Sequence, residues 1–219
     1  DRSRGLGDVY KRQVHTMLAF QKHPDITSIA VVCLCGWETV LHSYAHQYNV
    51  TKLHWIFPGG GNGQESIANG IYGLKENGVK EDDLVLIHDA VRPLVSQGII
   101  SSNIAICKQY GYAITGIQCR EAILESDDGF YSTTSIPRDK LIRTQPPQTF
   151  RLTNIIKSHE EARQKGIRNS VSSCTLLAEL GGYEMHIVPG EERNIKITTT
   201  EDLEIFKVLM QTSKEDWLK

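Results

Sequence analysis

The 219-residue chain carries 24 basic and 26 acidic side chains and has a formal net charge of −2. This balance argues against a protein that binds nucleic acid or a membrane surface, because such proteins usually show a basic excess or a basic face. The sequence has no apolar stretch long enough for a membrane span and no apolar secretion signal near its start, so we expect a cytoplasmic location.

Apolar runs and helical patterns alternate along the chain. We predict strands at 28–35, 53–57, 84–88, 112–118 and 184–188, and helices at 14–22, 38–48, 65–76, 97–110, 153–165, 172–180 and 201–210. Alternation of this kind predicts a three-layer, Rossmann-like α/β fold with a mostly parallel sheet. Residues 14–213 form one domain in this interpretation, because no internal repeat or linker divides them.

Two segments depart from the alternation. Residues 120–143 contain short extended pieces at 122–125, 130–134 and 141–143 around an Asp-Asp-Gly turn, which predicts a β-arm rather than a crossover helix. Residues 1–13 show no hydrophobic period, and residues 8–13 read like a translated sequencing adapter. We therefore interpret 1–13 as a non-native leader and exclude it from the predicted fold.

The most informative stretch is IHDAVRP at residues 87–93, directly after the apolar run 84–86. It predicts the carboxyl end of a parallel strand, where open α/β sheets bind their ligands. Asp89 can hold Mg²⁺ or a sugar hydroxyl, and Arg92 can donate two hydrogen bonds to a phosphate. The alternative is an Asp-Arg pair that only closes a strand-to-helix turn.

Two further segments carry candidate binding residues. Gly59, Gly60 and Gly61 follow the strand at 53–57, and their lack of a Cβ lets the backbone approach a planar ligand. Lys196 stands between two isoleucines on an extended segment, so its ammonium group is directed to one side.

Four segments in this order resemble the cytidylyltransferases that activate polyol phosphates. They are 57–71, 87–93, 138–148 and 194–198, and the resemblance runs from about His15 to Met210. It implies transfer of CMP from CTP to a polyol phosphate with release of pyrophosphate, and Mg²⁺ as cofactor. The first hypothesis for the acceptor is 2-C-methyl-D-erythritol 4-phosphate, an isoprenoid precursor. Ribitol 5-phosphate, used for cell-surface glycans, is the alternative, and a catalytically dead nucleotide-binding or dimerisation module is an alternative of another class.

The resemblance also implies roles for individual residues. The glycine turn and Ser66 would read cytosine, although a helix-capping role is the alternative for Ser66. Asp89 would lie near the ribose and the metal, with Arg92 at the same corner, while Lys196 would face the phosphates. The β-arm would embrace the other subunit of a homodimer. Arg138 of this arm would hold the acceptor phosphate in the site of that other subunit. The helix that opens at Ser172 would lie on the acceptor side.

The sequence departs from the family pattern at several of these places. The arginine of the glycine loop is replaced by Gly63, the arm threonine by Ala122 and the threonine before Pro-Gln by Pro146. A Thr-Asp pair is replaced by Ser172-Ser173. The acceptor is therefore less well defined than the nucleotide, and Gly36-Trp37 looks more like the ribitol-type group.

The family opens with a strand and a glycine-rich phosphate loop that have no counterpart before residue 14 of this sequence. The neighbours of a missing central strand would keep unpaired backbone groups. We therefore expect the 219-residue chain by itself to show no turnover.

Overall fold

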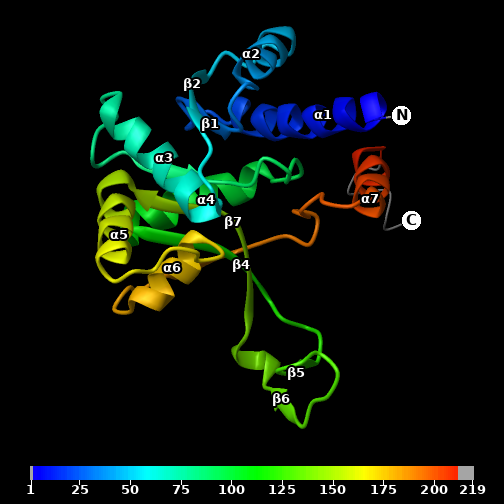
Figure 1. The fold of residues 1–219 in the computed structure, drawn as a ribbon, viewed down its shortest axis with the longest axis vertical. Helices are drawn as coiled ribbons and strands as arrows, with labels where there is room; N and C mark the ends of the chain where they lie inside the picture. Colours follow the sequence, from blue (N-terminus) through cyan, green and yellow to red (C-terminus); the bar gives the residue numbers. More distant parts are fainter. Residues whose placement is uncertain (1, 212–219) are drawn as a thin grey trace.

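The computed structural model of the protein describes residues 2–211, with side chains for residues 12–210. Helices alternate with strands along the first half of the chain, up to residue 118 (Figure 1). The helices are α1 (Arg2–Gln21), α2 (Glu38–Gln47), α3 (Gly63–Glu76), α4 (Gln97–Tyr110), α5 (Leu152–Gln164), α6 (Ser173–Leu180) and α7 (Thr200–Gln211). The strands are β1 (Ile29–Cys33), β2 (Leu53–Pro58), β3 (Leu84–Ile87), β4 (Tyr112–Gln118), β5 (Ile123–Glu125), β6 (Thr134–Ile136), β7 (Ile142–Arg151) and β8 (His186–Pro189). No described helix is both long and apolar enough to cross a membrane.

Helices cover both faces of the central strands. In β4, Ala113 packs with Cys107 of α4, whereas the next residue, Ile114, packs with Ile155 of α5. Neighbouring residues of a strand point to opposite faces, so α4 and α5 lie on opposite sides of the sheet. The predicted three-layer α/β fold is confirmed.

The body contains two groups of paired strands. Strands β1 and β2 are parallel, and a four-stranded sheet has the order β3-β7-β4-β8. Strand β4 is parallel to β8, while β7 runs antiparallel to both β3 and β4. The sheet is therefore mostly parallel with one long reversed strand at its centre.

The sequence prediction missed β7, because Pro146 and Pro147 argue against a central strand. In the structure, Ile114 of β4 pairs with Gln148 and the next residue, Thr115, pairs with Gln145. The register therefore passes over both prolines, which form a bulge. A proline is tolerated there because its missing N–H is not needed by the ladder.

Among the described strands, β1 and β3 are not paired with each other. Their facing residues line a cavity of about 830 Å³, which also reaches Ser66 at the start of α3 and Asp89 after β3. The cavity therefore reaches two of the candidate residues, Ser66 and Asp89.

Helix α1 begins at Arg2, far before the predicted start at residue 14, so the predicted boundary was wrong. Asp1 lies outside the described residues, and the side chains of 2–11 are outside the description as well. Arg12 belongs to the segment 1–13, which we excluded from the predicted fold. In the structure, however, its guanidinium donates to the Ile197 carbonyl at 2.9 Å. The non-native origin of residues 1–13 stays a prediction.

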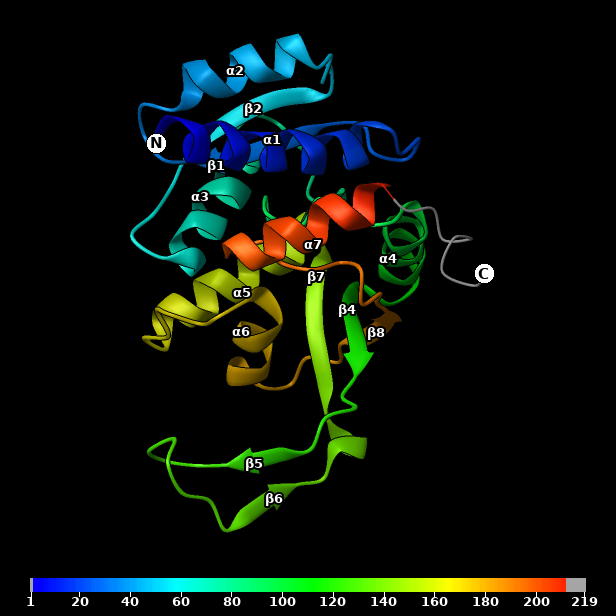
Figure 2. The same cartoon turned by 90° about the vertical axis from the view of Figure 1, so that its right-hand side faces the viewer.

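The predicted β-arm projects from the body in both views (Figures 1 and 2). Strands β5 and β6 pair antiparallel, as the sequence predicted. The second strand begins later than predicted, because the Asp128 carboxylate accepts hydrogen bonds from the backbone N–H groups of Phe130 and Tyr131. Those bonds keep residues 130–131 in the turn.

Candidate active site

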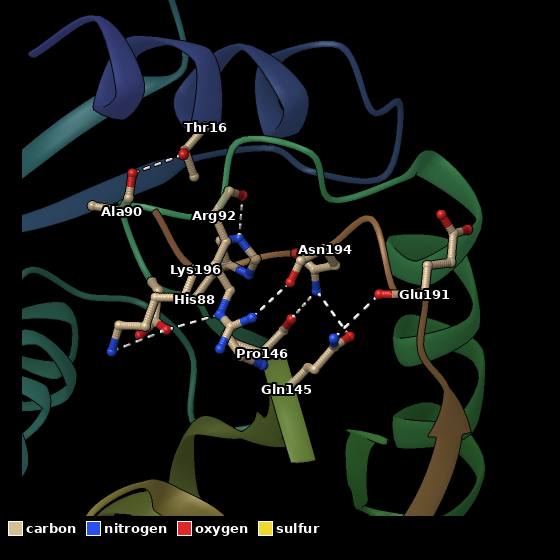
Figure 3. A network of polar contacts seen from close by, with 10 residues as sticks. Thr16, His88, Ala90, Arg92, Gln145, Pro146, Glu191, Asn194 and Lys196 are labelled. Carbon is tan, nitrogen blue, oxygen red and sulfur yellow. Dashed lines mark hydrogen bonds and ion pairs between the residues drawn. The ribbon is translucent and has the colours of Figure 1, made fainter. Parts of the chain in front are cut away.

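Three predicted residues meet at the carboxyl end of β3. Arg92 donates through Nε to Asp89 Oδ2 at 3.0 Å, and the Lys196 ammonium lies 3.6 Å from the same oxygen (Figure 3). The Arg92 side chain is 15% exposed, while Asp89 is 37% and Lys196 51% exposed. The Asp89 carboxylate thus lies between a fixed guanidinium and a more accessible ammonium. The cluster contains two cationic groups and one anionic group, so its formal charge is positive.

Arg92 is fixed by a second hydrogen bond. Its NH1 donates to the carbonyl of Asn194 at 2.6 Å, and the Asn194 side-chain amide donates to the Pro146 carbonyl at 2.8 Å (Figure 3). Asn194 is fully buried. It therefore joins the β7 bulge to the segment that carries Lys196. The sequence marked Asn194 only as the first residue of a motif and gave it no role, because the contact with the prolines exists only in the fold.

His88 forms the buried wall of this cluster. Its Nε2 lies 3.0 Å from the Arg92 carbonyl, and its ring packs edge-on against Phe20 of α1. Burial lowers the pKa of His88 to about 4, and the hydrogen bond to the Arg92 carbonyl opposes that shift only in part. His88 is therefore neutral at physiological pH and adds no positive charge to the cluster.

The glycine turn folds back onto the first turn of α3. Gly60 N donates to Ser66 Oγ at 3.0 Å, and Gly61 N donates to the Glu65 carboxylate at 2.7 Å. A Cβ on Gly60 would lie 2.3 Å from the Glu65 Cβ, so this position excludes any side chain. The helix is capped by Asn62, whose side chain accepts from Glu65 N. Ser66 is thus not the N-cap; its hydroxyl shapes the turn.

The predicted acceptor-side residue Ser172 caps α6. Its hydroxyl accepts from Thr175 N at 3.3 Å, and the Thr175 hydroxyl accepts from Ser172 N at 2.8 Å. Gln148 of β7 accepts from Cys174 N at 2.9 Å, which ties the first turn of α6 to the central sheet. The sequence marked Gln148 only as the last residue of a motif and gave it no role, since it follows the two prolines in a segment not predicted as strand.

Arg138 lies on the arm, in a short 3₁₀ turn (Arg138–Lys140), and its guanidinium donates to the Arg120 carbonyl. Within the described residues of one chain, the structure does not bring Arg138 to Asp89 or Lys196, because the arm points away from the body (Figure 2). Arg143, the second residue of β7, pairs with Glu192 in an exposed contact.

The donor set at this site suits Mg²⁺ only when a nucleotide is present. Among the described residues, no group of three or more His, Cys, Asp and Glu side chains could hold a metal ion. Mg²⁺ commonly takes one or two carboxylates and completes its shell with water and substrate phosphates. Asp89 can supply one such ligand, and phosphate oxygens must supply others.

Comparison with known proteins identifies the family. The family model for 2-C-methyl-D-erythritol 4-phosphate cytidylyltransferase (IspD) matches residues 11–212. Ribitol-5-phosphate cytidylyltransferase of Lacticaseibacillus paracasei is 32% identical over 90% of this chain and 85% of its own length. The 2-C-methyl-D-erythritol 4-phosphate cytidylyltransferase of Clostridium acetobutylicum is 34% identical over 90% of this chain and 83% of its own.

Solved structures agree with this assignment. The 4-diphosphocytidyl-2C-methyl-D-erythritol synthase of Anaerococcus prevotii shares the fold with a TM-score of 0.80 at 24% identity, covering 92% of this chain and 90% of that one. The 2-C-methyl-D-erythritol 4-phosphate cytidylyltransferase of Francisella tularensis has a TM-score of 0.75 at 26% identity, covering 89% and 85%. The chain therefore belongs to the IspD family of CTP-dependent cytidylyltransferases.

Proposed function

We propose that the cluster of Asp89, Arg92 and Lys196 is where CMP is transferred from CTP to a polyol phosphate. In this reaction a phosphate oxygen of the acceptor attacks the α-phosphorus, the bond to the β-phosphate breaks, and pyrophosphate leaves. The observation that carries the proposal is the position of Asp89 after β3, where its carboxylate contacts Arg92 and Lys196 and lines a cavity that also reaches Ser66. Base recognition at the glycine turn and phosphate chemistry at the cluster then take place in one connected site.

The charges suit this step. Negative charge grows on the phosphate oxygens as the leaving group departs, and positioned cations stabilise it. Arg92 is held by Asp89 and the Asn194 carbonyl, so it supplies a fixed positive field. Lys196 is half exposed and supplies the ammonium that contacts phosphate. No general base is required, since the attacking group is already an anion.

Mg²⁺ is part of this proposal, with Asp89 as its protein ligand. A bound Mg²⁺ would neutralise phosphate oxygens of CTP. Asp89 accepts from Arg92 on Oδ2. A carboxylate has further acceptor positions, so Asp89 can keep this hydrogen bond while it binds a cation.

Two acceptors are candidates. The family model and the Clostridium acetobutylicum relative carry the name of 2-C-methyl-D-erythritol 4-phosphate, whereas the Lacticaseibacillus paracasei relative carries that of ribitol 5-phosphate. The similar identities support both, and Gly36-Trp37 favours the ribitol compound. The altered acceptor-side positions, Ala122, Pro146 and Ser172, are where the two pockets would differ.

We also propose that the enzyme is a cytoplasmic homodimer in which the β-arm of one subunit reaches the site of the other. The arm is exposed and ends in apolar side chains, with Phe130 86% and Tyr131 82% exposed. Apolar groups of this size on a projecting hairpin are typical of a surface that another chain covers. Arg138 would then bind the acceptor phosphate of the partner's site.

Pyrophosphate release tests the proposal. It should be measured with CTP, UTP or ATP, with and without each polyol phosphate and Mg²⁺. The 219-residue chain is compared with an extended enzyme, in which the N-terminal segment of the Lacticaseibacillus paracasei relative replaces residues 1–13. We expect release only with CTP, Mg²⁺ and one polyol phosphate, and we expect it from the extended enzyme. A preference for UTP or ATP would overturn the base assignment, and comparable turnover by the 219-residue chain would overturn the leader interpretation.

A further inference from the structure

One glutamine side chain joins the first turn of α3, which follows the glycine turn, to the loop that precedes α6. Gln64 lies in the first turn of α3, two residues before Ser66. Its Nε2 donates to the Ile167 carbonyl at 2.9 Å, and its Oε1 accepts from Ser170 N at 2.8 Å. Both ends of the amide are therefore used on one short segment. A side chain that matches a donor and an acceptor at once fixes the orientation of that segment as well as its distance.

Ser170 carries this connection onward to α6. Its N–H is bound by Gln64, while its hydroxyl donates to the Glu179 carboxylate of α6 at 2.7 Å. Ser170 is 6% exposed, so both bonds are shielded from water. Two residues later, Ser172 caps α6. A set of hydrogen bonds thus runs from the first turn of α3 through Ser170 to α6, the helix on the acceptor side.

The loop depends on these side-chain contacts because it has no regular structure of its own. Residues 167–170 are in neither helix nor strand, and Val171 is 92% exposed. A second link comes from Asn62, whose Nδ2 donates to the Arg168 carbonyl at 3.1 Å. Helices α3 and α5 pack against each other, and this loop follows α5 (Figures 1 and 2). The turn before α3 and the loop after α5 are therefore held together at one edge of the fold.

We propose that Gln64 is a positioning residue that fixes the acceptor-side loop 167–172 relative to the glycine turn. The proposal rests on the proposed function, in which the turn binds CTP and the start of α6 faces the polyol phosphate. Gln64 does not touch the reacting atoms in this proposal. Loss of its two hydrogen bonds lowers the affinity for the acceptor, because the loop must then be ordered at the time of binding.

The test uses the 219-residue chain with Gln64→Met, which keeps the length of the side chain and removes both polar atoms. Gln97→Met is the matched control, because Gln97 also lies in the first turn of a helix, where it donates to the Ala19 carbonyl at 2.8 Å. We call the two hydrogen bonds of Gln64 to Ile167 and Ser170 the clamp. Amide hydrogen exchange at Ser170 measures whether the clamp is present, and tryptic cleavage after the exposed Arg168 measures how well the loop is ordered. Calorimetric titration with CTP, ribitol 5-phosphate and 2-C-methyl-D-erythritol 4-phosphate reports binding.

We expect exchange at Ser170 and cleavage after Arg168 to accelerate on the order of tenfold in Gln64→Met and to stay unchanged in Gln97→Met. Affinity for the accepted polyol phosphate should fall on the order of tenfold, while CTP affinity changes less than about threefold. Gln64→Glu is a second variant, which keeps an acceptor for Ser170 N but offers Ile167 no donor. It should preserve protection at Ser170 while cleavage still accelerates.

Unchanged exchange at Ser170 in a folded Gln64→Met chain overturns the clamp, and an equal fall in both affinities overturns its acceptor-side role. If Gln64→Met does not fold, loss of Ser170 protection in Gln64→Glu overturns the clamp, and retained protection with faster cleavage supports it. If the unsubstituted chain binds neither CTP nor any polyol phosphate, the titrations are made with the extended enzyme, and absence of binding there overturns the proposed function and the acceptor-side role with it. Exchange at Ser170 then still decides whether the clamp exists.

Discussion

The Lys196 ammonium lies 3.6 Å from Asp89 Oδ2, the same oxygen that accepts from Arg92 at 3.0 Å. Asp89 and Arg92 follow β3, whereas Lys196 lies on the segment before α7. Their contact therefore brings together two segments that are far apart in the sequence. The Asp89 carboxylate contacts both the Arg92 guanidinium and the Lys196 ammonium. A phosphate ligand carries more negative charge than one carboxylate, so both cations can also bind it. The charge on Asp89 is therefore the part of the cluster most open to a direct test.

Asp89→Asn keeps the size of the side chain and removes its charge. In the extended enzyme we expect turnover to fall at least about a hundredfold, because the negative charge that pairs with Arg92 and would bind Mg²⁺ is lost. The Mg²⁺ concentration needed for half-maximal activity should rise. A variant with unchanged turnover and unchanged Mg²⁺ dependence would remove Asp89 from the proposed metal site. Circular dichroism serves as the folding control.

The glycine turn offers a matched pair of alanine substitutions. Gly60→Ala places a Cβ 2.3 Å from the Glu65 Cβ and 2.8 Å from the Glu65 carbonyl carbon, whereas a Cβ at Gly63 meets nothing within 4 Å. We expect Gly60→Ala to abolish measurable CTP binding in the extended enzyme. Gly63→Ala should bind CTP normally and be slightly more stable, since alanine is favoured over glycine inside a helix by about 1 kcal/mol. Equal CTP affinities for the two variants would contradict the proposed role of the turn.

Mixed dimers test the role of Arg138 in the partner's site. In the extended enzyme, Arg138→Ala should raise the Michaelis constant for the polyol phosphate on the order of 30- to 150-fold and nearly spare CTP affinity, because a charge-assisted contact is lost. Mixing Arg138→Ala with Asp89→Asn subunits creates heterodimers in which one site of two is intact. Random exchange should restore about a quarter of the original activity. No recovery despite confirmed subunit exchange would show that Arg138 does not act across the dimer.

The lowered pKa of His159 leads to a prediction of how folding stability depends on pH. Burial in α5 lowers its pKa to about 4 from the ordinary value of 6.5. The unfolded chain binds a proton below pH 6.5 and the folded chain does not, so folding stability falls as the pH drops from about 6.5 to 4. The loss attributable to His159 is about 3 kcal/mol near pH 4.

Chemical denaturation at pH 7 and pH 4 measures this effect. His159→Leu should lose less stability between the two pH values than the unsubstituted chain does. His42→Leu, at an exposed position of α2, is the control and should lose as much as the unsubstituted chain. The buried His88, whose pKa is also lowered to about 4, contributes equally in all three proteins. An equal loss in the His159 variant would show that this histidine does not set the acid sensitivity.

Local patterns in the sequence determined most of the elements and the candidate residues. The helix at Gln97–Tyr110 was predicted to the residue, because Ser96 supplies its N-cap and Gly111 its left-handed end. Asp89 and Arg92 were placed correctly at the end of a strand, since an apolar run followed by polar side chains indicates the edge of a sheet.

Only the tertiary structure decided the rest, because it depends on contacts between distant segments. Local propensity argues against a strand that contains Pro146 and Pro147, and the bulge opposite β4 is what makes β7 possible. Asn194 and Gln64 are ordinary polar residues in the sequence. The Asn194 amide donates to the Pro146 carbonyl, and the Gln64 amide donates to the Ile167 carbonyl. These partners are far away in the sequence, so no local pattern predicts the hydrogen bonds.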